Sequence, residues 1–176
     1  MGKQGRTVRT VVTYLRMTSP PHVFVPPPTG LRMALMKAEK PTTHFYRYLY
    51  NAVGDAYHWV ERKGLSDEEL AAIITSDKVS VFVAYAEGVP AGFFEIDERG
   101  EGDLWLTYFG VIPDFHGRGI GKWLLAEAID EAWGREPRSF SVETCTLDDP
   151  RALPLYQRMG FMPYERREKE LDVGEG

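Results

Sequence analysis

The chain has 176 residues, a length that suits one domain with its own hydrophobic core. Its formal net charge of −5 at pH 7 gives no general attraction to nucleic acid. A single cysteine, Cys145, excludes an internal disulfide and is typical of a reducing compartment. There is no apolar run long enough to span a membrane and no signal-peptide core. We therefore expect a cytoplasmic protein with no nucleic-acid or membrane partner.

The N-terminal thirty residues combine a predicted strand with a proline-rich loop. Residues 7–17 are rich in β-branched and aromatic side chains, as strands are. Five prolines between residues 19 and 30 exclude a helix or a central strand, and we expect a surface loop that packs Val23, Phe24 and Val25 onto the body. We assign residues 1–30 to an extension of a single domain, residues 31–168 to its main part and residues 169–176 to a frayed tail.

The middle of the chain predicts a strand, two helices and a hairpin. Residues 31–36 form a strand candidate, and Thr42 or Thr43 can cap a helix that Gly54 ends. Ser66 and Glu69 have capping-box spacing at the start of another helix. Residues 79–86 and 89–96 are predicted to form a hairpin. The helical part is dense in aromatic residues, which indicates either a packed helical layer or one wall of a substrate cleft.

The C-terminal half predicts a parallel crossover. A strand at 104–111 is followed by a helix with one apolar side and by a second strand at 139–145, an order that predicts parallel strands. Asp149 and Pro150 are expected to begin another helix, with Asp149 as its cap. Gly160 is expected to end this helix, and a last strand begins at residue 161.

Three alternate glycines stand where the strand at 104–111 leads into its helix. Gly117, Gly119 and Gly121 leave the backbone bare at a helix start, where unpaired N–H groups and the helix dipole attract anions, most often phosphate. Arg118 and Lys122 add positive charge. The spacing excludes two common phosphate loops. A Walker loop needs Gly and Ser or Thr where His116 and Trp123 stand, and a dinucleotide loop needs its third glycine elsewhere.

The stretch resembles a known acyl-CoA-binding motif. His116, Gly119 and Gly121 match the Gln/Arg-x-x-Gly-x-Gly/Ala pattern of the GNAT superfamily of N-acyltransferases, with His in place of Gln or Arg. A second GNAT pattern, Asn-x-x-Ala-x-x-Leu-Tyr-x-x-x-Gly-Phe, lies downstream. It is matched by Ala152, Leu155, Tyr156, Gly160 and Phe161, whereas Asp149 replaces the Asn. The two signatures together span about residues 104–161.

The resemblance implies a fold and an activity. The fold is α/β (α+β): a single domain with a mixed, mostly antiparallel sheet, helices on both faces and a parallel splay between the CoA-motif strand and the next strand. The activity is transfer of an acetyl group from acetyl-CoA to a primary amine, directly and through a tetrahedral intermediate. The acceptor is a small molecule or a peptide: a polyamine, an aminoglycoside-like drug, an amino acid and a protein N-terminus all remain open. The family makes a homodimer plausible.

The resemblance also implies site residues. The backbone of Phe109, Gly110 and Val111 would contact pantetheine and the acyl carbonyl, and Tyr156 would be the general acid that faces the sulfur. Its phenol has an unperturbed pKa of about 10 and so carries a proton to donate at neutral pH. The residues implied to hold the rest of the cofactor, mainly its pyrophosphate, are His116, Gly117, Arg118, Gly119, Ile120, Gly121, Lys122 and Asp149.

The general base is not defined by the motifs. Family members often place a carboxylate where Trp105 or Thr107 stands, and neither can act as a base. Glu95 on the neighbouring strand is the first candidate and Glu143 the second, while Tyr108 could relay a proton through water. An amine that enters neutral would need no base. The missing carboxylate favours an alternative, a non-catalytic acyl-CoA-binding or interaction module.

Two other chemistries find no support in the sequence. No histidine stands next to Cys145 to activate its thiol as a nucleophile. No group of His, Cys and carboxylate residues has metal-ligand spacing, so we expect no metal site.

Overall fold

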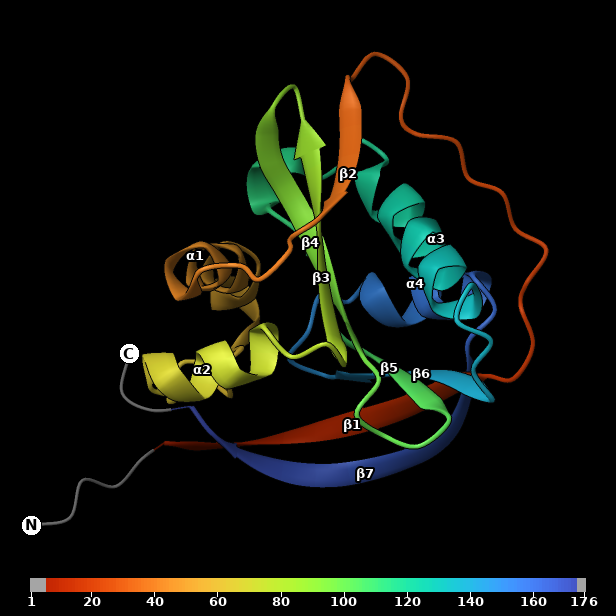
Figure 1. The fold of residues 1–176 in the computed structure, drawn as a ribbon. Helices are drawn as coiled ribbons and strands as arrows, with labels where there is room; N and C mark the ends of the chain where they lie inside the picture. The colour runs from red at the N-terminus through yellow and green to blue at the C-terminus, as the bar shows by residue number, and fades with distance from the viewer. Residues whose placement is uncertain (1–5, 174–176) are drawn as a thin grey trace, which may run out of the picture.

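The computed structural model describes residues 6–173, which form one seven-stranded sheet in the order β2-β3-β4-β5-β6-β1-β7 (Figure 1). The strands are β1 (Thr7–Met17), β2 (Met33–Lys37), β3 (Val79–Ala86), β4 (Val89–Asp97), β5 (Asp103–Val111), β6 (Ser139–Cys145) and β7 (Met162–Asp172). Neighbouring strands are antiparallel except β5 and β6, which are parallel. The predicted α/β fold with one parallel pair is confirmed.

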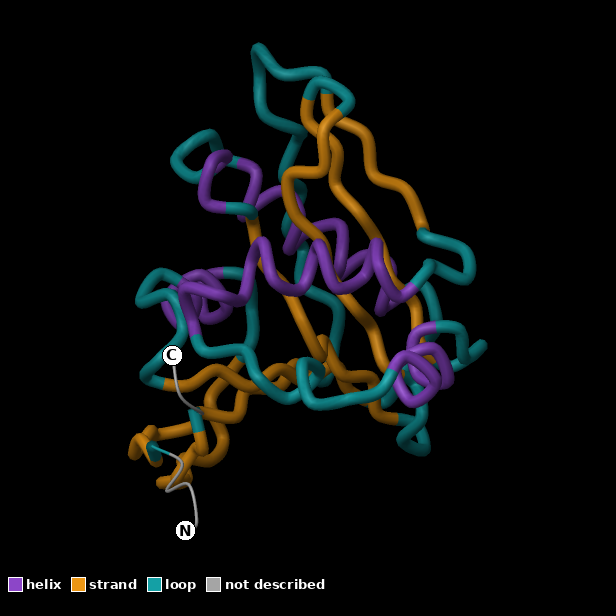
Figure 2. Tube along the Cα trace, turned by 90° about the vertical axis from the view of Figure 1, so that its left-hand side faces the viewer, coloured by secondary structure: helices purple, strands orange, loops and turns teal. Residues whose placement is uncertain are grey.

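Helices cover both faces of the sheet (Figures 1 and 2). They are α1 (Thr43–Gly54) and α2 (Asp67–Ile74) on one face, and α3 (Ile120–Trp133) and α4 (Ala152–Arg158) on the other, with short 3-10 turns η1 (Asp55–Tyr57) and η2 (Pro113–Phe115). Successive side chains of a strand point to opposite faces. Phe93 of β4 therefore joins the core under α1 and α2, while Phe94 joins the core under α3 and α4. No helix among residues 6–173 is long and apolar enough to cross a membrane.

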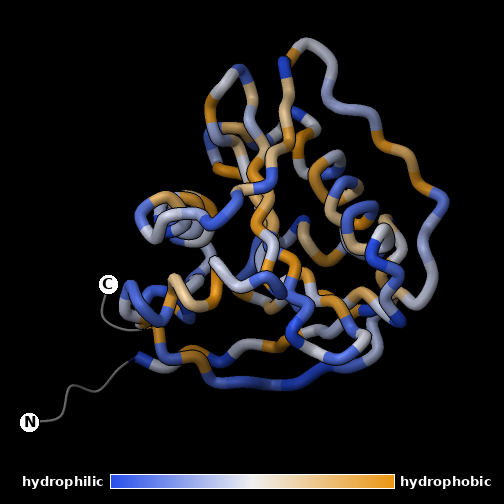
Figure 3. Tube along the Cα trace, viewed as in Figure 1, coloured by the Kyte–Doolittle hydropathy of each residue, from blue (hydrophilic) through white to orange (hydrophobic). Residues whose placement is uncertain are grey.

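The first strand lies inside the sheet, between β6 and β7. Thr13 pairs with Thr144 of β6 on one side and with Arg166 of β7 on the other. Residues 169–172 of the tail predicted at 169–176 instead continue β7 as far as the pair between Thr7 and Asp172, so this boundary was wrong. Residues 174–176 of that tail lie outside the described residues. β7 is hydrophilic for most of its length (Figure 3) and largely exposed, so its sequence lacks the alternation of apolar and polar residues that marks a strand.

Local capping chemistry explains two of the helix starts. The Thr42 hydroxyl accepts from the Phe45 N–H at 3.3 Å, and Ser66 and Glu69 form the expected reciprocal capping box. The helix predicted to start at Asp149 begins later, at Ala152, and has no side-chain cap. The Asp149 carboxylate instead accepts from the side chain and the N–H of Arg151, within a turn.

The proline-rich loop between β1 and β2 runs along the side of the molecule that carries α3 and α4 (Figure 1). Val25 packs against the core, as predicted, but Phe24 is 87% exposed, so the predicted burial of all three apolar residues was wrong. The loop also reaches the glycine motif, because a Cβ added to Gly119 would lie 3.9 Å from Cγ of Pro28.

Close packing of α1 on the sheet depends on Gly110. A Cβ at this position would overlap Cγ1 of Val53 in α1, so the absence of a side chain sets how near the helix lies to β5. Aromatic residues of α1 pack against β4 and β5. A shift of α1 would therefore also disturb the end of β5 that contains Gly110.

We predict that Gly110→Ala lowers the free energy of unfolding by about 1–3 kcal/mol, because overpacking forces the helix away from the strand. Urea unfolding measures the change. Gly64→Ala is the matched control, since a Cβ there meets no atom within 4 Å. Combining Gly110→Ala with Val53→Ala should remove the penalty of the added methyl group. Equal effects of the two alanine substitutions would contradict this reading of the contact.

Candidate active site

A cleft opens where β5 and β6 stop pairing. The parallel register extends from Asp103 opposite Ser139 to Leu106 opposite Val142, although β5 continues to Val111. Beyond the last pair lies a cavity of about 400 Å³, lined by both strands, the glycine motif, α4 and the segment of residues 57–61. The predicted parallel splay is therefore a real cavity, and it gathers most of the predicted site residues.

The glycine motif forms one end of this cleft. Gly117 and Gly119 have φ values of 75° and 79°, a left-handed backbone that side chains other than glycine rarely adopt. The first turn of α3 contains no acidic residue, so the N–H groups of Ile120, Gly121 and Lys122 present an uncompensated positive helix end. All five of these residues line the cavity. This end suits a diphosphate.

Arg118 departs from the prediction for this loop. It is absent from the cavity lining, and its guanidinium lies 5.5 Å from the centre of the Phe115 ring. We therefore leave Arg118 out of the candidate phosphate contacts.

Both ring nitrogens of His116 are engaged. Nε2 donates to the Val111 carbonyl oxygen at 2.8 Å, and Nδ1 accepts from Nη2 of Arg151 at 3.1 Å. The histidine that replaces Gln or Arg in the motif thus ties the glycine loop to the end of β5 and to the turn before α4.

Asp149 belongs to the same network. Arg151 donates to its carboxylate at 2.6 Å, and the Tyr57 hydroxyl donates to it at 3.1 Å. Hydrogen bonding from Arg151 is the main reason that the pKa of Asp149 is lowered to about 2. Asp149 lines the cleft as an ion-paired carboxylate, which is a different role from the expected helix cap.

Tyr156 lies on the floor of the cleft. It projects from α4, is 5% exposed, and its ring centre lies 6.0 Å from that of Phe109. Burial raises the pKa of its hydroxyl, and the charge of Asp148 adds to the effect, so the phenol holds its proton throughout the neutral range. Phe109, Gly110 and Val111 line the cleft beside it, as the motif implies.

The other end of the cleft is acidic and aromatic. Tyr108 of β5 donates to Oε2 of Glu61 at 3.1 Å, and Glu143 of β6 lines the same cavity. Burial raises the pKa of the Glu143 carboxyl; Lys169 opposes the rise, while Glu61 and Asp148 add to it. Glu61 is a site residue that no motif pointed to, because it stands in an irregular segment without periodicity.

Some aromatic residues of the middle region belong to the packed helical layer, and others line the cleft. Tyr46 is fully buried in the helical layer, whereas Trp59 lines the cleft with its ring centre 5.0 Å from that of Tyr108. Tyr50 packs against both of these cleft rings, at 5.4 and 5.1 Å.

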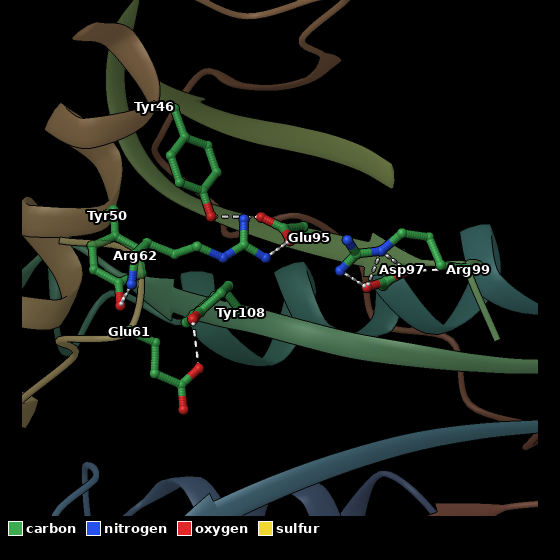
Figure 4. Close-up of polar contacts among 8 residues, drawn as sticks. All are labelled: Tyr46, Tyr50, Glu61, Arg62, Glu95, Asp97, Arg99 and Tyr108. Carbon is green, nitrogen blue, oxygen red and sulfur yellow. Dashed lines mark hydrogen bonds and ion pairs between the residues drawn. The ribbon is translucent and has the colours of Figure 1, made fainter. Parts of the chain in front are cut away.

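Glu95, the first candidate for the base, lies outside the cleft. It is fully buried, with Oε1 accepting from Nη2 of Arg62 at 2.8 Å and Oε2 accepting from the Tyr46 hydroxyl at 2.6 Å (Figure 4). Burial raises its carboxyl pKa, and the charge of Arg62 opposes this. Burial also lowers the pKa of Arg62, but attraction to Glu95, Tyr46 and Tyr108 and the hydrogen bond to Glu95 together outweigh it, so the net shift is upward. Both oxygens are occupied inside the core, so the structure argues against Glu95 as the base.

The Arg62–Glu95 pair instead anchors the segment that carries the acidic end. The Arg62 N–H donates to the Tyr50 hydroxyl at 3.3 Å, and its guanidinium lies 5.1 Å from the centre of the Tyr108 ring (Figure 4). Glu61 is the adjacent residue, so the buried pair fixes the backbone from which Glu61 reaches the cleft.

Neither metal chemistry nor a thiolate nucleophile finds support. Among residues 6–173 no group of His, Cys, Asp and Glu is placed to hold a metal ion. Cys145 lines the cleft, but burial raises the pKa of its thiol, which disfavours the reactive thiolate.

We predict that Glu95→Gln lowers the free energy of unfolding by about 3–5 kcal/mol, because it leaves the Arg62 charge buried without its partner. Glu98→Gln is the matched control, since Glu98 pairs with Arg135 nearer the surface and its loss should cost about 1 kcal/mol or less. Thermal or urea unfolding measures both. A Glu95→Gln variant of unchanged stability would contradict the anchoring role.

Comparison with known proteins agrees with this geometry. The model of the acetyltransferase (GNAT) family matches residues 40–161. A search of curated protein sequences gives no match. Among solved structures, a conserved protein of unknown function from Staphylococcus epidermidis ATCC 12228 aligns with a TM-score of 0.65 and 16% identity, over 96% of this chain and 64% of that chain. This chain therefore spans less than two thirds of that protein.

The similar structures include aminoglycoside acetyltransferases. AAC(6')-Iy in complex with CoA aligns with a TM-score of 0.56 and 24% identity, over 78% of this chain and 93% of that chain. The enzyme meta-AAC0020 from an uncultured soil metagenomic sample, in complex with sisomicin, aligns with a TM-score of 0.58 and 15% identity, over 73% and 87%. These likenesses concern the fold. The family match covers more than half of the chain, and the chain belongs to the GNAT family of acetyltransferases.

Proposed function

We propose that this chain is an N-acetyltransferase that moves an acetyl group from acetyl-CoA directly to the primary amine of a small cationic acceptor. The observation that carries the proposal is the cleft where β5 and β6 stop pairing, with an anion-binding helix end on one side and a pair of carboxylates on the other. A thioester held between these ends would meet an amine that enters from the acidic end.

The CoA end is supported by the chemistry of its lining. A diphosphate is matched by the N–H groups at the start of α3 and by the charge of Lys122. Past Leu106 the backbone of β5 does not pair with β6, although the Val111 carbonyl oxygen accepts from His116. Unpaired strand edges bind extended chains that carry amide groups. Pantetheine carries two amides, so residues 109–111 suit it, and a backbone N–H there could donate to the acyl carbonyl oxygen.

Tyr156 would supply the proton for the departing sulfur. A general acid must keep its proton until the leaving group develops negative charge. The raised pKa of Tyr156 lets it keep its proton until then. Its position beside Phe109 places it next to the proposed path of pantetheine.

Glu143 is the better candidate for the base. Unlike Glu95, it lines the cleft, and its raised pKa makes it a stronger base than a glutamate with an ordinary pKa. A protonated amine that reached Glu143 would lose a proton to it and become nucleophilic. Glu61 and the cleft aromatics would hold the cationic acceptor beside it.

Ligands of similar structures fit this description without identifying the acceptor here. The meta-AAC0020 enzyme is in complex with sisomicin, an aminoglycoside, and aminoglycosides are polycationic amines. An acetyl-CoA-dependent reaction and a lone cysteine also suit a cytoplasmic enzyme. The homodimer expected from the family stays a prediction.

We predict that acetyl-CoA raises the melting temperature of both the native chain and Tyr156→Phe, while the variant releases thiol from acetyl-CoA about 10²- to 10⁴-fold more slowly. The acceptor panel should include sisomicin and 1,4-diaminobutane. Tyr164→Phe, on the half-exposed face of β7, is the matched control and should keep full activity. If no acyl-CoA raises the melting temperature, the proposal fails. If acetyl-CoA binds but no amine of the panel causes thiol release, the non-catalytic alternative gains support.

We predict that kcat/KM rises with pH through the raised pKa of Glu143 and then levels off, because only the ionised carboxylate accepts a proton. That pKa lies above the ordinary glutamate value of about 4.3. Glu143→Gln should lower the rate and remove this acidic limb, whereas Glu165→Gln, which alters a surface pair with Arg167, should leave the profile unchanged. If Glu143→Gln kept the acidic limb of the pH profile unaltered, the base would be a different group.

A further inference from the structure

The last strand brings an amine of the chain itself to the acidic end of the cleft. Lys169 of β7 lines the cavity, and its Nζ lies 5.5 Å from the centre of the Tyr14 ring. Tyr14 stands directly opposite Glu143 in the register of β1 and β6. Lys169 and Tyr14 both fall outside residues 40–161, the part that matches the family model, so this arrangement comes from the chain's own first and last strands.

The charges around Lys169 are those that an incoming amine would meet. Hydrogen bonding to Tyr14 is the largest cause of the raised pKa of Lys169, and the charges of Glu143 and Glu61 add to it. The other cationic Lys and Arg side chains of the cavity come from α3, α4 and the turn before α4. Arg62 is near Tyr108 but is paired with Glu95. Lys169 is therefore the cavity cation whose charge acts on both cleft carboxylates, and it does so without a direct ion pair to either within the described residues.

We propose that Lys169 is a tethered competitor of the acceptor: its ammonium occupies the place beside Glu143 and Glu61 that the ammonium of the acceptor must take, and it moves out when the acceptor binds. The inference deepens the proposed function and rests on it for one point, that the acidic end receives the amine.

The setting of Lys169 allows it to be displaced. It is exposed and stands on the edge strand, and its flexible four-carbon stem lets the ammonium turn to solvent. Interactions between exposed charges contribute little to stability. Loss of the interaction between Lys169 and the two carboxylates therefore does not threaten the fold. The buried Arg62–Glu95 pair, in contrast, has no such freedom.

A tethered competitor would select among acceptors by charge. A reacting ammonium gives its proton to Glu143 and becomes neutral, so a monoamine leaves Glu61 without a cation once Lys169 has moved. A diamine keeps a second ammonium for Glu61. The chain should therefore prefer acceptors with at least two positive charges over monoamines of similar size.

Amine reactivity tests the position of Lys169 without any acetyl transfer by the enzyme. Trace labelling with acetic anhydride, read by peptide mass spectrometry, reports how readily each lysine reacts. We expect Lys169 to react faster in Glu143→Gln and Glu61→Gln, and faster in the native chain when 1,4-diaminobutane is present. Lys78, exposed and remote from the cleft lining, is the internal control and should not change. Unchanged labelling of Lys169 in both variants would overturn the proposal.

Binding of 1,4-diaminobutane, measured by calorimetry with CoA present, tests the competition itself. Lys169→Met should bind the diamine several-fold more tightly than the native chain, and Lys169→Arg should not. The matched control is Arg167→Met: Arg167 lies over the same Tyr14 ring but pairs with Glu165 and is absent from the cleft lining. Equal or weaker binding by Lys169→Met, or an equal gain in Arg167→Met, would overturn the proposal.

The two proposals fail in different ways. If labelling and diamine binding respond as stated but no amine releases thiol from acetyl-CoA, the acetyltransferase function fails and the competition stands. If thiol is released and depends on Tyr156 and Glu143 while Lys169→Met changes neither diamine affinity nor the preference for diamines, only the role of Lys169 fails.

Discussion

The end of backbone pairing between β5 and β6 is the constraint on which the rest of the site depends. A sheet normally satisfies the N–H and C=O groups of its inner strands, and leaving them unpaired is costly unless water or a ligand takes their place. Here the register stops after Leu106 and Val142, in the middle of a seven-stranded sheet. The sheet stays continuous through the β5–β6 pairs from Asp103–Ser139 to Leu106–Val142, and β6 is held on its other side by β1, over Val12 to Met17. The N-terminal strand therefore supports the cleft that the family motifs line.

A second constraint is the buried ion pair on the opposite face. Burying a guanidinium and a carboxylate costs free energy that only good geometry and further hydrogen bonds repay. Glu95 accepts hydrogen bonds from Arg62 at 2.8 Å and from the Tyr46 hydroxyl at 2.6 Å, whereas the buried Nη1 of Arg62 has no hydrogen-bond partner among residues 6–173. The pair fixes an irregular segment that would otherwise be free to move, and through it the position of Glu61 and Trp59 relative to the cleft. The carboxylate that the sequence offered as a candidate base thus has a structural role.

Features that depend on local chemistry could be read from the sequence. The alternate glycines and the capping box at Ser66 lie where the sequence placed them, and the helix that carries Tyr156 is present, although it begins at Ala152 and lacks the expected Asp149 cap. Long-range pairing could not be read. The partner of Glu95 is 33 residues away in a segment without periodicity, and the strand beside β7 comes from the other end of the chain. The same limit hid Glu61 and Lys169, since spacing alone does not show which charged residues meet across a sheet.

We propose that CoA lies between the parted strands with its sulfur next to Tyr156 and Glu143, the two proposed proton-transfer groups. A crystal structure of the chain with CoA tests this most directly. We expect the diphosphate on the N–H groups of residues 120–122, pantetheine along residues 109–111, and the thiol between Tyr156 and Glu143. CoA bound elsewhere, or bound in this cleft with its thiol remote from Tyr156, would rule out this placement.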